Sequence, residues 1–290
     1  MDSHPTPRLG LAFVPTLPPE RLPELAAAAE GAGLDELWVW EDAFKQSGIA
    51  SAGVALARTE RITVGIGLLP TPLRNVALTA MELATLERIH PGRLIAGVGH
   101  GVQEWMDQAG ARVASPLTLL REYTTALRSL LAGERVSVSG RYVRLRDVQL
   151  DWPPAATPPL MLGGSGPRSL ALAAELGDGN LLTNALTEQE VADIAALVRR
   201  TVGEQPRALV ATLIAATGPD AERRLQEEVP RWGGAPDAGI GVAGDAATVA
   251  AAVRRMAAAG ATSVCLQHTV DEPDLAGFVR FLGQEVKPLL

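Results

Sequence analysis

At 290 residues, 47% of them hydrophobic, the chain can bury a large core in one or two domains. Its net charge of −7 and the lack of any Lys/Arg-rich block argue against nucleic acid as a partner, and no uncharged apolar run reaches the about 18 residues that a membrane span requires. The polar, Pro-containing residues 1–8 lack the pattern of a secretion signal, so we expect them to be a short tail. The one cysteine, Cys265, excludes an intrachain disulfide. We therefore expect a cytoplasmic protein without a membrane partner.

Short apolar runs alternate with helical patterns along the first 100 residues. The predicted strands are 9–14, 36–40, 61–69 and 93–98, and the predicted helices are 20–30, 49–58 and 73–89. Each strand is apolar on both faces, which is typical of a parallel sheet that helices cover. The spacing then lengthens, because residues 102–158 hold a helix (117–131), an alternating hairpin (135–148) and a Pro-rich exit. We interpret 102–158 as an excursion from the main domain.

The regular alternation resumes after residue 158. The predicted strands here are 160–162, 179–183, 207–215 and 262–267, and the predicted helices are 169–176, 188–202, 219–228, 246–259 and one from about 273. Eight such strands are the number that closes a (β/α)8 TIM barrel, so we predict one α/β barrel domain over 1–290. The alternative is a doubly wound open sheet, but no dinucleotide-binding fingerprint follows the first strand.

A glycine-rich turn follows the fifth strand, in the run PLMLGGSGPRS (159–169). The turn contains Gly163, Gly164, Ser165 and Gly166, and Pro167 suits the first position of the next helix. A strand, a glycine turn and a helix N-terminus together aim free backbone N–H groups at an anion. The pattern predicts a phosphate-binding turn, and the alternative is an ordinary turn whose glycines allow tight packing.

Further candidate residues stand at the carboxyl ends of several other strands, where the active sites of such barrels lie. The candidates are Trp40, Glu41, Asp42, Gly67, Leu68, His100, Gly101, Asn184, Gln267 and His268. Adjacent side chains of an extended chain point to opposite sides, so only one of Glu41 and Asp42 should face the site. His100, between two glycines, could act in catalysis or contact a phosphate. The four histidines lie far apart in the sequence, so we expect no metal site.

Several of these pieces together resemble a known superfamily. They are LWVWEDAF (37–44), the run 62–93 that begins ITVGIGLL, LIAGVGHG (94–101), PPLMLGGSGPRSLALAAELGDG (158–179) and GATSVCLQ (260–267). In order and spacing they resemble the luciferase-like, flavin-dependent oxidoreductases. The likeness is closest to the branch that uses the deazaflavin coenzyme F-420, such as methylene-tetrahydromethanopterin reductases and sugar-phosphate dehydrogenases.

The resemblance implies a barrel whose mouth holds a flavin-type ring, in a homodimer. It also implies a non-prolyl cis peptide in the third strand, at Gly67-Leu68, which would back the ring. The cofactor phosphate would lie on two turns, His100-Gly101 and Gly163-Gly164 with Ser165-Gly166. Glu41 falls where the family often carries an Asp that hydrogen-bonds the cofactor.

The chain departs from the sugar-phosphate dehydrogenases at two positions. Their catalytic histidine and glutamate correspond here to Asp42 and Val102. Asp42 would donate the proton if burial raises its pKa. The expected function is hydride transfer between coenzyme F-420 and a small organic substrate. The alternatives are a monooxygenase that uses reduced FMN and oxygen, and a cofactor-binding protein with little catalysis.

Overall fold

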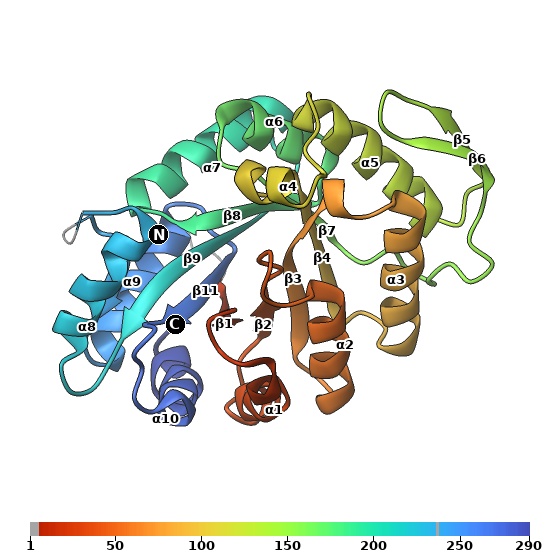
Figure 1. The fold of residues 1–290 in the computed structure, drawn as a ribbon. Coiled ribbons are helices and arrows are strands. Elements are labelled where there is room, and N and C mark those ends of the chain that lie inside the picture. The colour runs from red at the N-terminus through yellow and green to blue at the C-terminus, as the bar shows by residue number, and fades with distance from the viewer. Residues whose placement is uncertain (1–5, 236–237) are drawn as a thin grey trace.

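The apolar runs of the sequence form parallel strands that close into a barrel (Figure 1). The computed structural model describes residues 6–235 and 238–290. The barrel strands are β1 (Arg8–Phe13), β2 (Glu36–Val39), β3 (Thr63–Pro70), β4 (Leu94–Gly99), β7 (Leu160–Gly163), β8 (Gly179–Ala185), β9 (Ala208–Ala216) and β11 (Ser263–His268). They pair in this order, and β11 pairs with β1 to close the ring. The predicted TIM barrel is confirmed.

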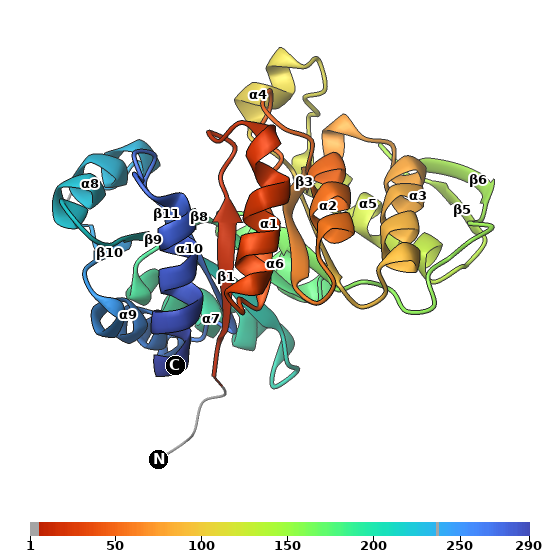
Figure 2. The same ribbon diagram turned by 90° about the horizontal axis from the view of Figure 1, so that it is seen from below.

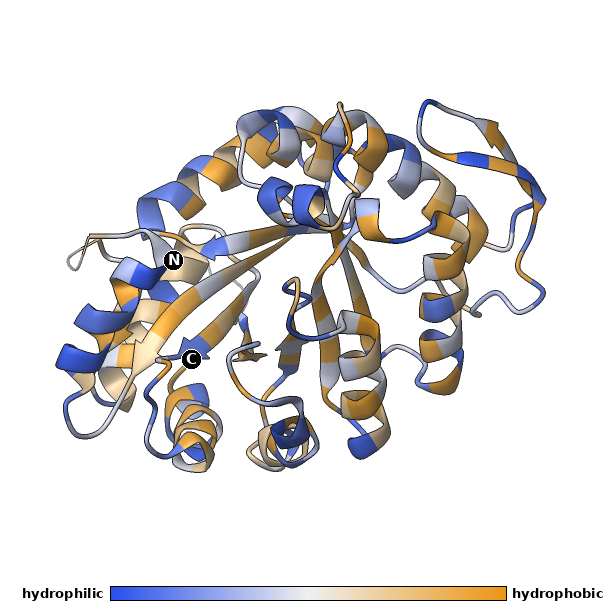
Figure 3. Cartoon of the chain, in the orientation of Figure 1, coloured by the Kyte–Doolittle hydropathy of each residue, from blue (hydrophilic) through white to orange (hydrophobic). Residues whose placement is uncertain are grey.

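Helices cover the outside of the barrel (Figures 1 and 2). They are α1 (Leu22–Gly31), α2 (Gly48–Arg58), α3 (Val76–Ile89), α5 (Pro116–Leu131), α6 (Pro167–Leu176), α7 (Glu188–Val202), α8 (Ala221–Glu228), α9 (Ala246–Ala258) and α10 (Leu275–Arg280). Several begin at a residue whose side chain caps the first turn, as Ser47, Asn75, Thr187 and Asp245 do. Figure 3 shows hydrophobic residues along the strands and hydrophilic ones on the outer helices. The main core therefore lies between strands and helices.

Short helical segments complete the chain. They are η1 (Pro19–Arg21), η2 (Thr71–Leu73), η3 (Val229–Trp232), η4 (Phe281–Val286) and η5 (Lys287–Leu289). None of the helices in the described part of the chain combines the length and the apolar character needed to cross a bilayer.

The segment 102–158, which was predicted as an excursion, also holds one element of the regular helical layer. Helix α5 packs between α3 and α6, so it is a regular member of the helical layer around the barrel. Only two parts of 102–158 are additions: the short helix α4 (Gln103–Gln108), which the sequence did not indicate, and the hairpin of β5 (Val136–Ser139) and β6 (Arg144–Val148). The Pro-rich segment after the hairpin lengthens the stretch of sequence between β4 and β7. For this reason the sequence spacing did not indicate that α5 belongs to the helical layer.

A ninth parallel strand, β10 (Gly241–Ala243), was not predicted. It pairs with Ile214–Ala216 at the end of β9, beyond the point where the pairing of β8 with β9 ends at Thr212. Strand β9 extends past the end of its pairing with β8, and β10 pairs with the backbone N–H and C=O groups of β9 that β8 leaves unpaired.

Trp38 fills the middle of the barrel interior. Its indole Nε1 donates to Glu36 Oε2 at 2.8 Å, and Arg8 Nε donates to Glu36 Oε1 at 2.6 Å. The ring has room because β3 carries Gly65 beside it, where a Cβ would lie 2.4 Å from a ring atom. This tryptophan closes the barrel interior below the carboxyl ends of the strands.

Candidate active site

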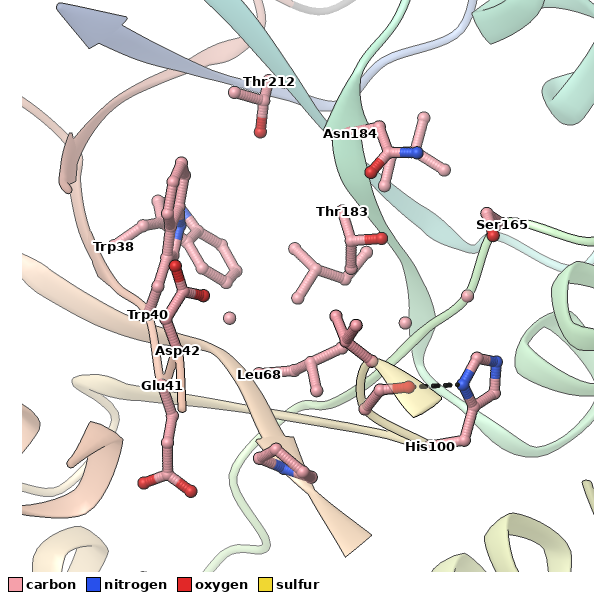
Figure 4. Close-up of a pocket in the computed structure, with 18 of the residues that line it drawn as sticks. Trp38, Trp40, Glu41, Asp42, Leu68, His100, Ser165, Thr183, Asn184 and Thr212 are labelled. Atoms are coloured by element: carbon pink, nitrogen blue, oxygen red, sulfur yellow. Dashed lines mark hydrogen bonds between the residues drawn. The ribbon is translucent and has the colours of Figure 1, made fainter. Parts of the chain in front are cut away.

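A cavity of about 440 Å³ opens at the carboxyl ends of the barrel strands (Figure 4). Its volume is in the range of small-molecule sites. The predicted residues that line it are Trp40, Glu41, Asp42, Gly67, Leu68, His100, Gly101, Gly163, Gly164, Ser165 and Asn184. Gly166 lies next to the cavity as the N-cap of α6. The chain thus brings residues from five strand ends to one place.

The third strand bulges into this cavity at Leu68. The Gly67–Leu68 peptide is cis, as the resemblance implied, and the β3–β4 register shifts between Ile66 and Leu69. The Leu68 side chain lies over two glycines of neighbouring strands, because a Cβ on Gly99 or Gly163 would come within 2.6 or 2.2 Å of its Cδ2. A second non-prolyl cis peptide, which the sequence did not indicate, joins Ala43 to Phe44.

The side chains of Glu41 and Asp42 point in opposite directions (Figure 4), as the alternation of an extended chain predicts. The Glu41 carboxylate accepts hydrogen bonds from Arg74 Nη1 and from the Gly48 N–H, the latter at 2.7 Å. Arg74 also pairs with Glu82 at 3.3 Å. The hydrogen bonds of the Glu41 carboxylate therefore go to residues at the starts of α2 and α3. Asp42 is the carboxylate that faces the cavity.

Asp42 lies in surroundings that favour its protonated form. Its side chain is 28% exposed, and Lys45 Nζ lies 3.6 Å from Oδ2. Burial raises the pKa of Asp42 above its usual value, and the positive charge of Lys45 opposes that rise only in part. The carboxyl group therefore keeps its proton to a higher pH than an exposed aspartate would.

His100 lies across the cavity from Asp42, beside the glycine turn (Figure 4). Its Nδ1–H donates to the Gly101 carbonyl at 3.1 Å, and its Nε2 lies 3.3 Å from Ser169 Oγ in the first turn of α6. No side chain caps the N-terminus of α6, and a Cβ on Gly164 would come within 2.5 Å of Ser169 Cβ. Helix N–H groups that no side chain caps, behind a glycine-rich turn, fit a phosphate group.

Two candidates from the end of β11 lie outside the cavity wall. Gln267 and His268 are both buried, and neither lines the cavity. His268 Nδ1–H donates to the Thr269 carbonyl at 2.7 Å, and its ring packs edge-on against Phe278. Burial lowers the pKa of His268, which is consistent with a neutral ring in the core.

Other residues of the wall were not singled out from the sequence. Thr212 points into the cavity from β9, and a polar residue in an otherwise apolar strand was a signal that could have found it. Trp232 reaches the cavity from η3 and meets Trp40 edge-on, with 5.7 Å between the ring centroids. Trp232 follows a surface helix, and the residue that it contacts, Trp40, is far away in the sequence. The sequence around Trp232 therefore gives no signal that its side chain reaches the cavity.

The family model described as luciferase-like monooxygenase matches residues 4–263. The chain belongs to that family. Among curated relatives of this luciferase-like chain, the 5,10-methylenetetrahydromethanopterin reductase of Methanolobus tindarius is 32% identical over 173 residues, which are 60% of this chain and 53% of the relative. The F-420-dependent glucose-6-phosphate dehydrogenase of Nakamurella multipartita is 31% identical over 180 residues, 57% of this chain and 52% of the relative.

The luciferase-like chain spans about half the length of the curated relatives it matches. A solved F-420-dependent secondary alcohol dehydrogenase, in complex with an F-420–acetone adduct, has a TM-score of 0.85 at 21% identity. That match covers 98% of this chain and 99% of the other. It shows that the two proteins share the whole barrel fold.

Proposed function

We propose that the protein is an oxidoreductase that transfers a hydride between coenzyme F-420 and a small organic substrate. One observation carries the proposal: a single cavity joins an uncapped helix N-terminus behind a glycine turn to a protonatable carboxyl group on the opposite side. The two curated relatives named above, a reductase and an F-420-dependent dehydrogenase, support the same class of reaction.

The residues of the cavity fit such a coenzyme. The turn from Gly163 to Gly166 and His100 would bind the phosphate, and Leu68 would support the ring. When bound, the deazaflavin supplies or accepts the hydride. Asp42 holds a proton at its carboxyl oxygen for the substrate, and the buried Trp38 closes the floor against water.

Coenzyme titration tests this proposal. The purified protein should bind oxidised F-420, followed by the fluorescence of the coenzyme. Gly164→Ala should weaken binding about tenfold or more, because the new methyl group would clash with Ser169 in the turn. Gly31→Ala is the matched control, because a Cβ there meets nothing within 4 Å. Binding of neither F-420 nor FMN would overturn the whole cofactor proposal.

Two alternatives would be separated by the same titration. A monooxygenase that uses reduced FMN could use the same phosphate turn, and tight binding of FMN alone would favour it. A cofactor-binding protein with little catalysis is suggested by Val102, which stands where some relatives carry a catalytic glutamate and is 47% exposed at the start of α4. Binding of F-420 without turnover of any tested substrate would favour that alternative.

We also propose that the protein is a cytoplasmic homodimer that pairs through the outer faces of α2 and α3. These helices contact each other on one flank of the barrel (Figure 2). Their exposed hydrophobic residues are Val54, Leu78, Met81 and Ile89, with 43%, 48%, 57% and 64% of their surface exposed. A group of this kind on one face is typical of a protein–protein interface.

Light scattering after size-exclusion chromatography tests the dimer. The protein should elute with twice its chain mass, and Met81→Lys should shift it toward the monomer, because a charge would be buried without a partner. Val270→Lys changes an exposed hydrophobic residue near β11 and should leave the dimer intact. A monomeric wild-type protein would refute this interface.

A further inference from the structure

We propose that the substrate is an uncharged, largely apolar carbonyl compound or alcohol, and that Trp232 selects it. This inference rests on the proposed function and adds the substrate class. It follows from the part of the cavity that lies away from the phosphate turn, from the charges in the cavity wall, and from the contacts that hold Trp232.

The wall opposite the glycine turn is aromatic and apolar. Figure 4 shows Trp38, Trp40 and Asp42 on one side of the cavity, with His100 and Ser165 on the other and Leu68 between them. The cavity is also lined by Val210, Thr212, Trp232 and Cys265. Burial raises the pKa of the Cys265 thiol well above its usual value, so this side chain is also uncharged. Such a wall favours an apolar substrate body.

The cavity has no positive side chain for an anionic substrate. Among the described residues that line it there is no lysine or arginine, and the carboxyl group that faces it is that of Asp42. Lys45 and Arg74 do not line the cavity, and they pair with Asp42 and with Glu41. A phosphate or carboxylate bound here would lose its hydration without gaining an ion pair from a lysine or arginine of the wall. An uncharged substrate avoids that cost.

Trp232 is held in place by two other elements. Its ring meets Trp40 edge-on, with an interplanar angle of 77°, and its Nε1–H donates to Glu228 Oε1 at 3.1 Å. Glu228 is buried, and its other oxygen accepts from the Val270 N–H at 3.1 Å. These contacts therefore fix the position of the indole over the cavity. Its removal would enlarge the cavity on this side.

The reaction balances for a carbonyl substrate. The substrate carbon gains a hydride, which the reduced coenzyme of the proposed function supplies, and the carbonyl oxygen takes the proton of Asp42. The C=O double bond becomes a C–O single bond, the substrate is reduced by two electrons, and the coenzyme is oxidised by two. The reverse direction oxidises an alcohol, with Asp42 as the proton acceptor.

Tryptophan fluorescence can test the inference without any coenzyme. The chain has five tryptophans, and four line the cavity, namely Trp38, Trp40, Trp105 and Trp232. The fifth, Trp152, is 72% exposed and packs on Arg88 outside the cavity. In a Trp152→Phe background the signal therefore reports on the cavity alone.

The probes are propiophenone and benzoylformate, two aryl ketones of similar shape, of which the second carries a carboxylate. We expect propiophenone to quench the fluorescence and to bind about tenfold tighter or more than benzoylformate. Glucose 6-phosphate should cause no quenching. Equal or tighter binding of either anion would overturn the inference, as would a lack of quenching by propiophenone.

Trp232 is tested with the complete, F-420-loaded protein. Trp232→Ala should raise the KM for propiophenone about tenfold and leave the Kd for F-420 within about twofold. Trp152→Ala should change neither value. Trp232→Phe keeps a ring but loses the Glu228 hydrogen bond, so its KM for propiophenone should lie between those of the wild-type and Trp232→Ala proteins. This variant also controls for a fold defect in Trp232→Ala. An unchanged KM in both Trp232 variants would remove its role, whereas a loss of F-420 binding by the wild-type protein would instead refute the proposed function.

Discussion

Replacing Asp42 with asparagine should lower turnover by about 100-fold or more and leave the Kd for the coenzyme nearly unchanged. Asparagine keeps the shape of the side chain but carries no acidic proton. The phosphate turn is on the other side of the cavity, beside His100, so the change does not touch it. Steady-state turnover and coenzyme titration on the same preparation measure the two effects separately. Asp151→Asn, at an exposed aspartate, is the control.

The rate of reduction, with Asp42 as the proton donor, should change with pH in a defined direction. Because burial raises the pKa of Asp42, reduction should slow as the pH rises through that raised pKa, at a higher pH than for an exposed aspartate. Lys45→Met should move this fall to still higher pH, because Lys45 lowers the pKa. Asp42 also contributes most to folding stability at low pH, and that contribution is lost as the pH rises through the folded-state pKa. Unchanged turnover in Asp42→Asn would exclude Asp42 from the mechanism.

Gly97→Ala should destabilise the fold by about 3 kcal/mol. A Cβ on Gly97 in β4 would lie 2.2 Å from the backbone oxygen of Ile66 on β3, at the bulge that supports Leu68. A backbone atom inside the barrel cannot rotate away as a side chain can, so the two strands would have to separate. Urea unfolding followed by circular dichroism measures the loss.

Gly31→Ala is the matched control for this prediction. It adds the same methyl group at the end of α1, in open space, and should be neutral or stabilise the protein by up to about 1 kcal/mol. Equal stabilities of the Gly97 and Gly31 variants would show that β3 and β4 are not packed as described.

The barrel itself could be predicted from the sequence because strands buried on both faces appear as apolar runs between helical patterns. The strand β10 could not, because its three residues pair only where β9 extends past β8. The position of α5 was hidden for a related reason. It depends on contacts with α3 and α6, which sequence spacing does not contain.

The candidate site was predicted where a residue follows a strand directly, as Asp42, His100 and the glycine turn do. The partner of Glu41 could not be predicted, since Arg74 approaches it from another loop. Trp38 looked like any apolar strand residue, and its place inside the barrel depends on the space that Gly65 leaves on the neighbouring strand. The cis bond at Gly67–Leu68 came only from the family resemblance.

Leu68 and the two glycines beneath it also constrain how this chain can change. A methyl group at Gly99 or Gly163 would collide with Leu68 Cδ2, so enlarging either glycine requires Leu68 to turn its side chain away or to be replaced by a shorter residue. A shorter residue at 68 would remove the collision and leave a gap over both glycines. The effects of substitutions at the three positions should therefore depend on one another, and combined variants should show epistasis even though the residues lie on three different strands.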